Sequence, residues 1–301
     1  MKDLTKGYPA KVIILFAIPM IFGSIFQQLY NIADSKIVST FVGTEAFAAV
    51  GATSVVSNTL IGFLNSLTLG FAIPIANSFG GKDYKRMRRM VAGTVLLTLA
   101  GAVVLTVLIL LLIPAILKLL ATPEDIMSPA LAYVRIILYG IIFVSVYNMC
   151  ANVLRAVGDS RTPLYCLIIS VFVNIGLDLL FVNGFHMGIQ GAAWATIISQ
   201  ALSAVLCLGY ILLKFRDIIP EKDEWKPVEE QYSELLTTGL AMGFMSLVVN
   251  FGTIVLQGAI NGLGTAIVAA HTAARKVFDI FTVSLYCLGN ACLLYTSPSP
   301  R

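Results

Sequence analysis

The stretch IILFAIPMIFGSIFQQLYNIAD, from Ile13 to Asp34, decides the fold class. It is long enough to cross the roughly 30 Å of bilayer hydrocarbon as one helix. It also carries features that a passive anchor does not need, namely Pro19, the amides of Gln27 and Gln28, and the carboxylate of Asp34. Because ionisable groups within a membrane span are costly and tend to mark ion or substrate paths, this segment is a candidate functional helix.

The composition of the whole chain agrees with this first segment. Of 301 residues, 58% are hydrophobic and 12% are charged, whereas soluble domains carry about 25% charged residues. The mean hydropathy is +0.88. The apolar runs are about twice as long as the strands of an outer-membrane barrel. These properties predict an all-α polytopic membrane protein and exclude a soluble fold.

Eight membrane spans can be drawn along the chain, separated by turn and loop signals. They cover approximately residues 11–34, 46–78, 90–113, 130–154, 163–182, 188–213, 235–260 and 266–294. The breakers that we expect to end them are Gly80-Gly81, Pro114, Thr122-Pro123, Gly158-Asp159 and Asn183-Gly184. The start, MKDLTKGYPAK, has no small-residue cleavage site, so we expect the first helix to be retained.

The positive charges predict the orientation of the chain. Fourteen lysines and arginines fall on one side of the predicted spans, against three on the other. The positive-inside rule therefore places the N-terminus in the cytoplasm. The run RMRRM, residues 86–90, is interpreted as a topology signal alone. The five cysteines lie in apolar runs without metal-ligand spacing, which predicts buried thiols and no zinc or disulfide.

A charged connector divides the chain into two unequal parts. We expect residues 1–214 to form a six-helix N-terminal lobe, 215–234 a cytoplasmic connector, and 235–292 the first two helices of a second lobe. Two segments of the second part, GLAMGFMSL and LGTAIVAAHTA, are similar to FAIPMIFGS and VGTEAFAAVGA of the first. An even number of helices per repeat predicts parallel halves. The tail at 293–301, which includes TSPSPR, suggests truncation or foreign sequence, and we expect the parent protein to be about half as long again.

Polar residues on three predicted spans agree in depth. Asp34 and Tyr30 lie one turn apart on the first helix, Asn174 and Asp178 are four residues apart on the fifth, and Thr196 follows the start of the sixth. All five fall in the outer half of the membrane, where they form an oxygen shell for a small cation or a proton site. The alternatives are that Asp34 is an interfacial helix end and that Asp178 caps a loop or bonds the next helix.

Two other polar sets have both a structural and a functional interpretation. Asn148 and Asn152 share one face of the fourth helix, where asparagines commonly join neighbouring helices. His271, Arg275 and Asp279 follow i, i+4, i+8 spacing on the eighth helix. An intrahelical pair between Arg275 and Asp279 is the simpler interpretation, and a role in the cavity of the second lobe is the alternative.

Four segments together resemble the multidrug and toxic compound extrusion (MATE) family of cation-coupled antiporters, and its bacterial drug-efflux branch in particular. They are AIPMIFGSIFQQLYNIADSKIVSTFVG, ANVLRAVGDSRTPL, VNIGLDLLF and GIQGAAWATIISQ. The resemblance implies two six-helix bundles arranged as a V, with alternating access by rocking. It also implies that Asp34, Tyr30, Asn174, Asp178 and Thr196 bind the coupling proton or sodium ion. The seventh predicted helix has no acidic residue, which favours coupling in the first lobe.

The expected function is export of organic, mainly cationic, drugs or toxic metabolites in exchange for H⁺ or Na⁺, with the identity of the ion left open. Residues expected to line the substrate cavity are Gln27, Phe26, Asn148 and Asn152. No metal is expected beyond Na⁺ at Asp34 and Asp178, and no cofactor. We expect a monomer in the bacterial cytoplasmic membrane, with the bilayer and a small organic substrate as its partners and no nucleic acid.

Three other functions fit the sequence less well than an antiporter does. A flippase for lipid-linked sugars needs several basic residues in its cavity, and few fall inside the predicted spans. An intramembrane enzyme is disfavoured because the chain has no HExxH or GxSxG motif and only two histidines. A channel is disfavoured because no segment resembles a repeated filter loop.

Overall fold

The computed structural model describes residues 8–120, 122, 124–261, 274, 278 and 282–294. Among these residues the regular structure is helical and contains no strand. The long helices are α1 (Pro9–Phe41), α2 (Thr44–Gly80), α3 (Tyr84–Leu119), α4 (Glu124–Ala156), α5 (Arg161–Asp178), α6 (Gly188–Lys214) and α7 (Glu229–Asn261). All seven are long and apolar enough to span a membrane, which confirms the predicted class.

A shorter apolar helix, Thr282–Leu294, is what the structure describes of the eighth predicted span. The residues His271, Arg275 and Asp279 lie outside the described part of the chain, as do residues 295–301 of the tail. The predicted first lobe contains α1 to α6, and its boundary at residue 214 coincides with the end of α6.

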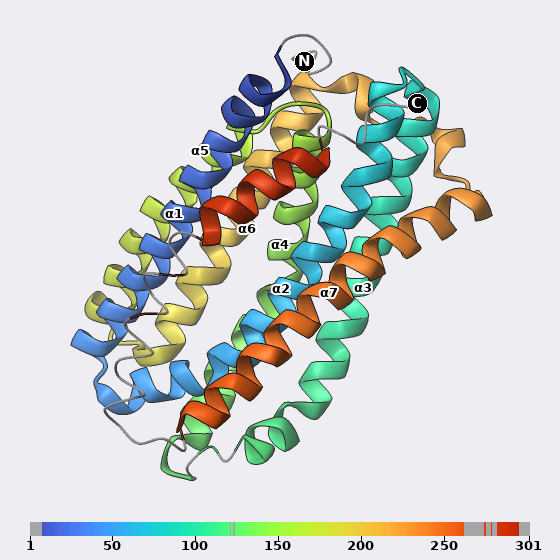
Figure 1. Cartoon of the computed structure of the whole chain (residues 1–301). Coiled ribbons are helices and arrows are strands. Elements are labelled where there is room, and N and C mark those ends of the chain that lie inside the picture. Colours follow the sequence, from blue (N-terminus) through green and yellow to red (C-terminus); the bar gives the residue numbers. More distant parts are fainter. Residues whose placement is uncertain are drawn as a thin grey trace.

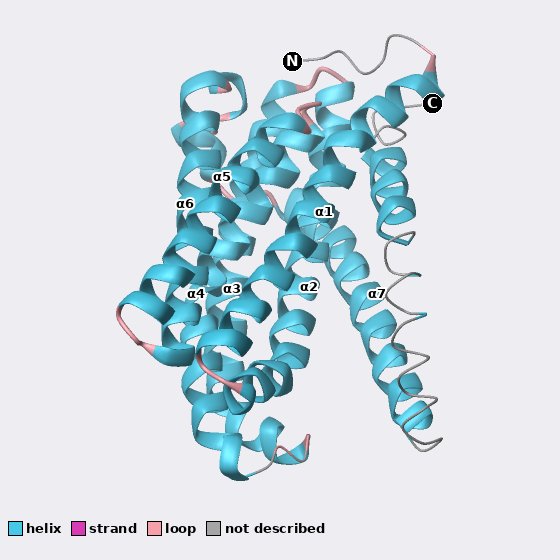
Figure 2. Ribbon diagram, turned by 90° about the vertical axis from the view of Figure 1, so that its left-hand side faces the viewer, coloured by secondary structure: helices cyan, strands magenta, loops and turns pink. Residues whose placement is uncertain are grey.

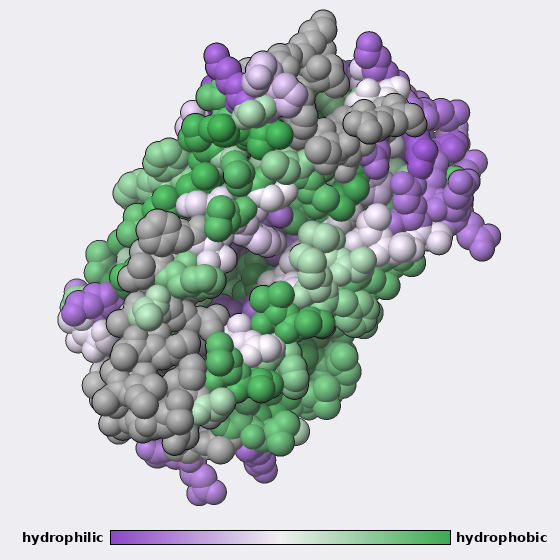
Figure 3. Space-filling model, viewed as in Figure 1, coloured by the Kyte–Doolittle hydropathy of each residue, from purple (hydrophilic) through white to green (hydrophobic). Residues whose placement is uncertain are grey.

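Within the bundle of α1 to α6, α2 and α4 pack on each other and each of them packs on several other helices (Figure 1). The helix α2 packs on α3, α4 and α7, while α4 also packs on α6, and α1 packs on α5. Large side chains such as Leu64, Phe71 and Leu138 are fully buried between these helices. Many apolar side chains nevertheless face outward, and Figure 3 shows an apolar surface between two polar ends. This distribution fits a bundle whose solvent is lipid.

The predicted breakers mark helix ends, with one exception. Gly80 ends α2, and the backbone then turns through Lys82 with a φ of 59°, before the Asp83 side chain caps α3 by accepting a bond of 3.0 Å from the amide of Arg86. The prediction that Pro114 ends the third span is wrong, because α3 continues through it to Leu119. In an apolar environment, losing one backbone hydrogen bond costs less than ending the helix and exposing several polar groups.

The connector, residues 215–234, lies at one end of the bundle, which we call the connector end (Figure 1). It contains two short 3₁₀ helices, Arg216–Ile218 and Lys222–Trp225, followed by the first turns of α7. Ile218 is fully buried. The start of α1 lies at the same end, and the loop between α1 and α2 lies at the opposite end (Figure 1).

The helix α7 crosses α2 at a place where both helices carry glycine. A Cβ atom on Gly70 would lie 2.5 Å from the carbonyl oxygen of Thr238, and one on Gly239 would collide with the ring of Phe71. Further along, the rings of Phe63 and Phe244 meet edge to face at 6.3 Å. Beyond this contact, α7 diverges from the six-helix bundle toward the opposite end (Figure 2).

Candidate functional site

A polar cavity of about 300 Å³ lies among α1, α2, α4 and α6. We call it the carboxylate cavity. It is lined by polar side chains that include Gln27, Tyr30, Asp34, Asn58, Tyr133, Thr196 and Gln200. None of its described lining residues is a lysine or an arginine. The cavity is therefore polar with a single carboxylate in its wall, inside an otherwise apolar bundle.

Two of the predicted residues are in direct contact. The hydroxyl of Tyr30 donates a hydrogen bond of 3.1 Å to Oγ1 of Thr196, whose own hydroxyl donates at 3.0 Å to the carbonyl of Ala192. The bond joins α1 to α6 across 166 residues of sequence. The structure thus brings together these two residues of the first and sixth helices.

Asp34 lies inside α1, not at its end. The helix continues seven residues to Phe41, which is about two turns. The carboxylate lines the carboxylate cavity, and its Oδ1 atom is buried without a hydrogen-bond partner among the described residues. The alternative that Asp34 is merely an interfacial helix end is therefore wrong.

Asn174 and Asp178 lie one turn apart on α5, and both are fully buried. No side-chain polar atom of either residue has a hydrogen-bond partner in the described structure. Asp178 is followed by a π-helix, Leu179–Gly184, and makes no capping bond to it. The alternative that Asp178 caps a loop is therefore not supported. Asn174 and Asp178 are not among the residues in the wall of the carboxylate cavity.

The two carboxylates interact electrostatically. Asp34 acts on Asp178, and both act on the phenol groups of Tyr30 and Tyr133. Tyr133 of α4 is 8% exposed and lines the carboxylate cavity. Sequence reasoning missed Tyr133, because a single tyrosine in an apolar helix gives no signal of the direction in which it points.

A smaller cavity of about 110 Å³ lies closer to the start of α1. We call it the arginine cavity, and its polar lining includes Gln27, Asn65, Tyr147, Asn148, Arg155 and Asn290. Gln27 lines both cavities. Among the residues expected to line a substrate cavity, Gln27 and Asn148 do so, whereas Phe26 and Asn152 line neither of the two.

Asn152 joins two helices instead. It is buried, and its amide nitrogen donates at 3.0 Å to Oγ1 of Thr68 on α2. Its amide oxygen accepts a bond of 2.9 Å from Nη1 of Arg155, three residues further along α4. This is the structural role that asparagine commonly has between membrane helices.

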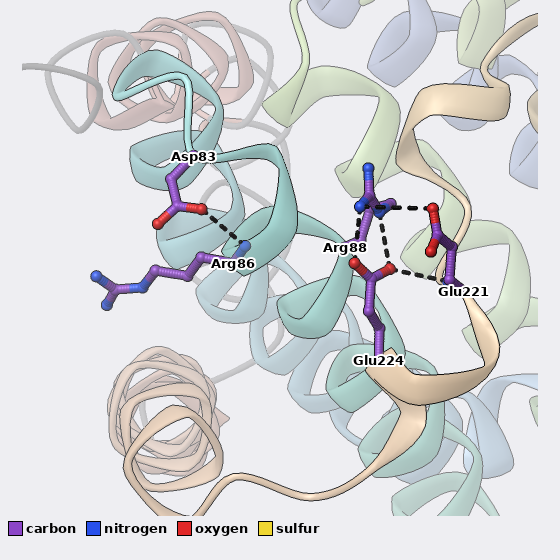
Figure 4. A network of polar contacts seen from close by, with 5 residues as sticks. All are labelled: Asp83, Arg86, Arg88, Glu221 and Glu224. Atoms are coloured by element: carbon purple, nitrogen blue, oxygen red, sulfur yellow. Dashed lines mark hydrogen bonds and ion pairs between the residues drawn. The ribbon is translucent and has the colours of Figure 1, made fainter.

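The arginines at the start of α3 hold the connector (Figure 4). Arg88 donates from Nε and Nη2 to the two carboxylate oxygens of Glu224, at 2.7 Å each, and lies 3.8 Å from Glu221. Arg86 pairs with Glu234 at 2.6 Å. The hydrogen bonds from Arg88 hold the pKa of Glu224 below its ordinary value. Interpreting RMRRM as a topology signal alone is therefore wrong, because two of its arginines form specific contacts.

Comparison with known proteins identifies the family. The family model for MatE matches residues 19–180, more than half of the chain. The probable multidrug resistance protein YpnP of Bacillus subtilis is 29% identical over 289 residues, which is 96% of this chain and 64% of YpnP. The probable multidrug resistance protein NorM of Thermotoga maritima is 27% identical over 272 residues, covering 89% of this chain and 58% of NorM.

Solved structures agree with the sequence comparison. A crystal structure of MATE in the bent conformation matches with a TM-score of 0.90 and 26% identity, over 98% of this chain and 66% of that one. A MOP superfamily transporter from Pyrococcus furiosus, described as having a binding pocket of reverse polarity, matches with a TM-score of 0.89 and 27% identity, over 98% and 65%. This chain thus spans about two thirds of the length of these proteins. It belongs to the MatE family.

Proposed function

We propose that the protein is a secondary active antiporter that exports organic cations in exchange for H⁺ or Na⁺ by alternating access. The observation that carries the proposal is the carboxylate of Asp34 in the wall of a polar cavity within a membrane bundle, with a second buried carboxylate, Asp178, on the helix α5 that packs on α1. Three of their four oxygens are buried without a hydrogen-bond partner in the described structure. Such groups are costly in a membrane and are retained where they bind an ion or a substrate.

The arrangement suits the exchange of one positive charge for another. Two nearby carboxylates disfavour simultaneous ionisation, so a proton or Na⁺ bound between them relieves their repulsion. A cationic substrate in the carboxylate cavity supplies the same compensating charge to Asp34. We propose that substrate and coupling ion compete for this charge, so that binding of one favours release of the other.

The donor set fits a proton or Na⁺ better than a transition metal. The carboxylate cavity is lined by carboxylate, amide and hydroxyl groups, and oxygen ligands suit hard cations. The described part of the chain contains no group of three or more His, Cys, Asp or Glu side chains placed to hold a metal ion. Asn174, Thr196 and Tyr30 would supply the neutral oxygens, and Tyr30 and Tyr133 offer aromatic faces to a cationic substrate.

The orientation and the location are part of the same proposal. The excess of lysine and arginine at the connector end supports a cytoplasmic position for that end. The carboxylate cavity would then lie on the outer side of the arginine cavity. We propose a monomer in the cytoplasmic membrane of a bacterium. The relatives named as multidrug resistance proteins support drugs as the substrates, and they do not favour a lipid-linked sugar flippase.

The first experiment measures drug efflux from cells that express the full-length protein, with wild type beside Asp34→Asn and Asp178→Asn. Each amide keeps the shape of the carboxylate and removes its charge. Asp125→Asn, at an exposed position near the start of α4, is the matched control. We expect both cavity variants to lose efflux at unchanged membrane abundance, while the control pumps normally. Normal pumping by both variants would contradict the proposal.

A second experiment identifies the coupling ion and separates an antiporter from a channel. In proteoliposomes, substrate flux is measured with a proton gradient, with a sodium gradient, and with neither. We expect one of the two gradients to drive flux against the substrate concentration. Flux that proceeds equally without a counter-gradient would show a channel and overturn the antiporter.

A further inference from the structure

Two arginines at the start of α3 hold two different parts of the chain. Arg88 holds Glu224 of the connector, whereas Nη2 of Arg86 donates at 2.6 Å to Oε2 of Glu234 on α7. Residues two apart on a helix do not face the same side, and Figure 4 shows the side chains of Arg86 and Arg88 leaving α3 in opposite directions. The start of α3 is therefore tied to the connector on one side and to α7 on the other.

The contact between α3 and the connector is shielded from water. The side chains of Arg88 and Glu224 are 21% and 4% exposed, and two bonds of 2.7 Å join them. The backbone amide of Glu221 donates a third bond to Glu224, and Ile218 of the same segment is fully buried. Breaking a buried, bidentate ion pair is costly because it leaves a desolvated charge without a partner. Residues 215–225 are therefore firmly attached to the bundle of α1 to α6.

The contact between α3 and α7 is more exposed. The side chains of Arg86 and Glu234, which we call the α3–α7 pair, are 46% and 32% exposed. Exposed ion pairs contribute little to stability, because water replaces either partner when the pair separates. This pair can therefore break and re-form while the protein stays folded.

The α3–α7 pair lies where α7 packs closely on α3. A Cβ atom on Gly93 of α3 would lie 2.7 Å from Cδ1 of Leu235, which is fully buried and follows Glu234 directly. Toward the opposite end of the bundle, α7 diverges from the other helices (Figure 2). The structure is therefore closed between α3 and α7 at the connector end.

A short segment separates the two contacts along the chain. The second 3₁₀ helix of the connector ends at Trp225, and α7 begins at Glu229. Between them, Lys226 has an extended backbone, with φ −68° and ψ 128°, and Pro227 has no amide hydrogen to donate. A few residues between two elements can absorb large changes in φ and ψ. Residues 226–228 are therefore placed to let α7 move while the connector stays in position.

We propose that the α3–α7 pair is a gate, which holds the connector end closed and breaks when α7 moves away from α3 in the transport cycle, with residues 226–228 as the hinge. Arg88 and Glu224 stay paired in both states, so the connector remains on the bundle. The proposal rests on the alternating access of the proposed function and names a contact that controls one of its two states. Arg86 and Glu234 then set the balance between the closed and open states.

The test measures two distances in the full-length protein by pulsed electron paramagnetic resonance. Spin labels are attached through unnatural amino acids, so that the native cysteines stay unlabelled. One pair of labels joins Lys214 at the end of α6 to Glu229 at the start of α7, and the other joins Lys214 to Asp223 in the connector; all three positions are exposed. Spectra at several pH values and Na⁺ concentrations sample both states. We expect two values for the first distance in wild type and one value for the second.

Variants then locate the gate. Arg86→Gln and Glu234→Gln should raise the ratio of open to closed protein about 1.4-fold to 5-fold, which corresponds to the usual strength of an exposed ion pair. Exchanging the charges, in the double variant Arg86→Glu with Glu234→Arg, should return the ratio to that of wild type. Asp223→Asn, which breaks the exposed ion pair with Lys226, is the matched control for the first distance and should leave the ratio unchanged.

The outcomes separate the gate from the proposed function. If no condition gives wild type a second distance between Lys214 and Glu229, alternating access and the gate are both overturned. If wild type has two distances and the two Gln variants keep their ratio, the gate is overturned while alternating access stands. A distance from Lys214 to Asp223 that changes together with the first would show that the connector moves with α7, and would overturn the hinge. Gln variants that fail to fold would make the α3–α7 pair structural and overturn the gate as well.

Discussion

Two buried carboxylates of this molecule have opposite surroundings. Glu224 in the connector is 4% exposed, and it accepts two bonds from Arg88 and one of 2.8 Å from the backbone amide of Glu221. Asp178 in α5 is fully buried, and neither of its oxygens has a hydrogen-bond partner in the described structure. The carboxylate of Glu224 therefore accepts three hydrogen bonds, whereas the carboxylate of Asp178 accepts none from the described residues.

The difference leads to different predictions for the two carboxylates. Burying a charge costs free energy unless it is paired and hydrogen-bonded. Glu224 meets this condition, so its removal should destabilise the connector. Asp178 does not meet it, which is what we expect of a group that is kept for the proposed coupling of ion and substrate and not for stability. Four predictions test this contrast.

The largest effect on stability is expected from Glu224→Ala, which leaves Arg88 without its main partner. We expect the free energy of unfolding in mild detergent to fall by about 2–3 kcal/mol, the range for hydrogen bonds to charged groups. Asp178→Asn, which removes an unsatisfied charge, should leave the free energy of unfolding unchanged or raise it. Equal destabilisation by the two substitutions would show that Asp178 is structural too.

A double-mutant cycle isolates the contact itself. For Arg88→Ala and Glu224→Ala we expect a coupling energy of about 1–2 kcal/mol, as found for residues in direct contact. Lys226 and Asp223 form the matched exposed pair, at 3.4 Å and with side chains 78% and 90% exposed. Their coupling should be close to zero. Similar coupling in both cycles would mean that burial does not strengthen the Arg88 pair.

Acid should remove part of the same stabilisation. The pKa of Glu224 is held below its ordinary value of 4.5, mainly by hydrogen bonds from Arg88. A depressed pKa contributes stability that is fully present above the unfolded-state pKa and is lost as the pH falls through the folded-state value. The gap in melting temperature between wild type and Glu224→Gln should therefore be constant at neutral pH and narrow below pH 4.5. A gap that widens in acid would contradict the assignment.

The smallest effect is expected at the neutral contact of the site. Thr196→Val removes the acceptor of the Tyr30 hydroxyl and should cost about 1 kcal/mol of stability or less. Thr59→Val, at a hydroxyl that bonds only its own helix at Val55, is the matched control. We expect Thr196→Val to lower efflux further than the control does. Equal efflux by the two variants would limit the Tyr30–Thr196 bond to a structural role.

The class of fold could be predicted from the sequence, and so could three of the residues that line the carboxylate cavity, Tyr30, Asp34 and Thr196. Apolar length alone predicts the spans, and a count of helical turns places Asp34, Asp178 and Thr196 at one depth. The contact of Tyr30 with Thr196 was implied by that depth and by the family resemblance. Helix bounds were predicted less well, because Pro114 does not end α3.

What the sequence could not provide is the direction of side chains around each helix. Asn148 and Asn152 are one turn apart on α4, yet the former lines a cavity and the latter bonds α2. Arg155 is one of the fourteen basic residues that predict the orientation, and only packing shows that it faces the arginine cavity. The partners of Arg86 and Arg88 lie more than 130 residues away. Such contacts depend on tertiary packing, which no local pattern encodes.

Because α2 and α7 cross closely at Gly70 and Gly239, a small change in the angle between the two helices moves the far end of α7 by a large distance. From Gly239 to the last residue of α7, Asn261, the helix runs 22 residues, or about 33 Å at 1.5 Å per residue. A rotation of about 10° at the crossing therefore displaces the C-terminal end of α7 by about 6 Å, while the two backbones hardly move at the crossing itself. Bulk added at Gly239 would act on this pivot, and its effect would be greatest at the distant end of the helix.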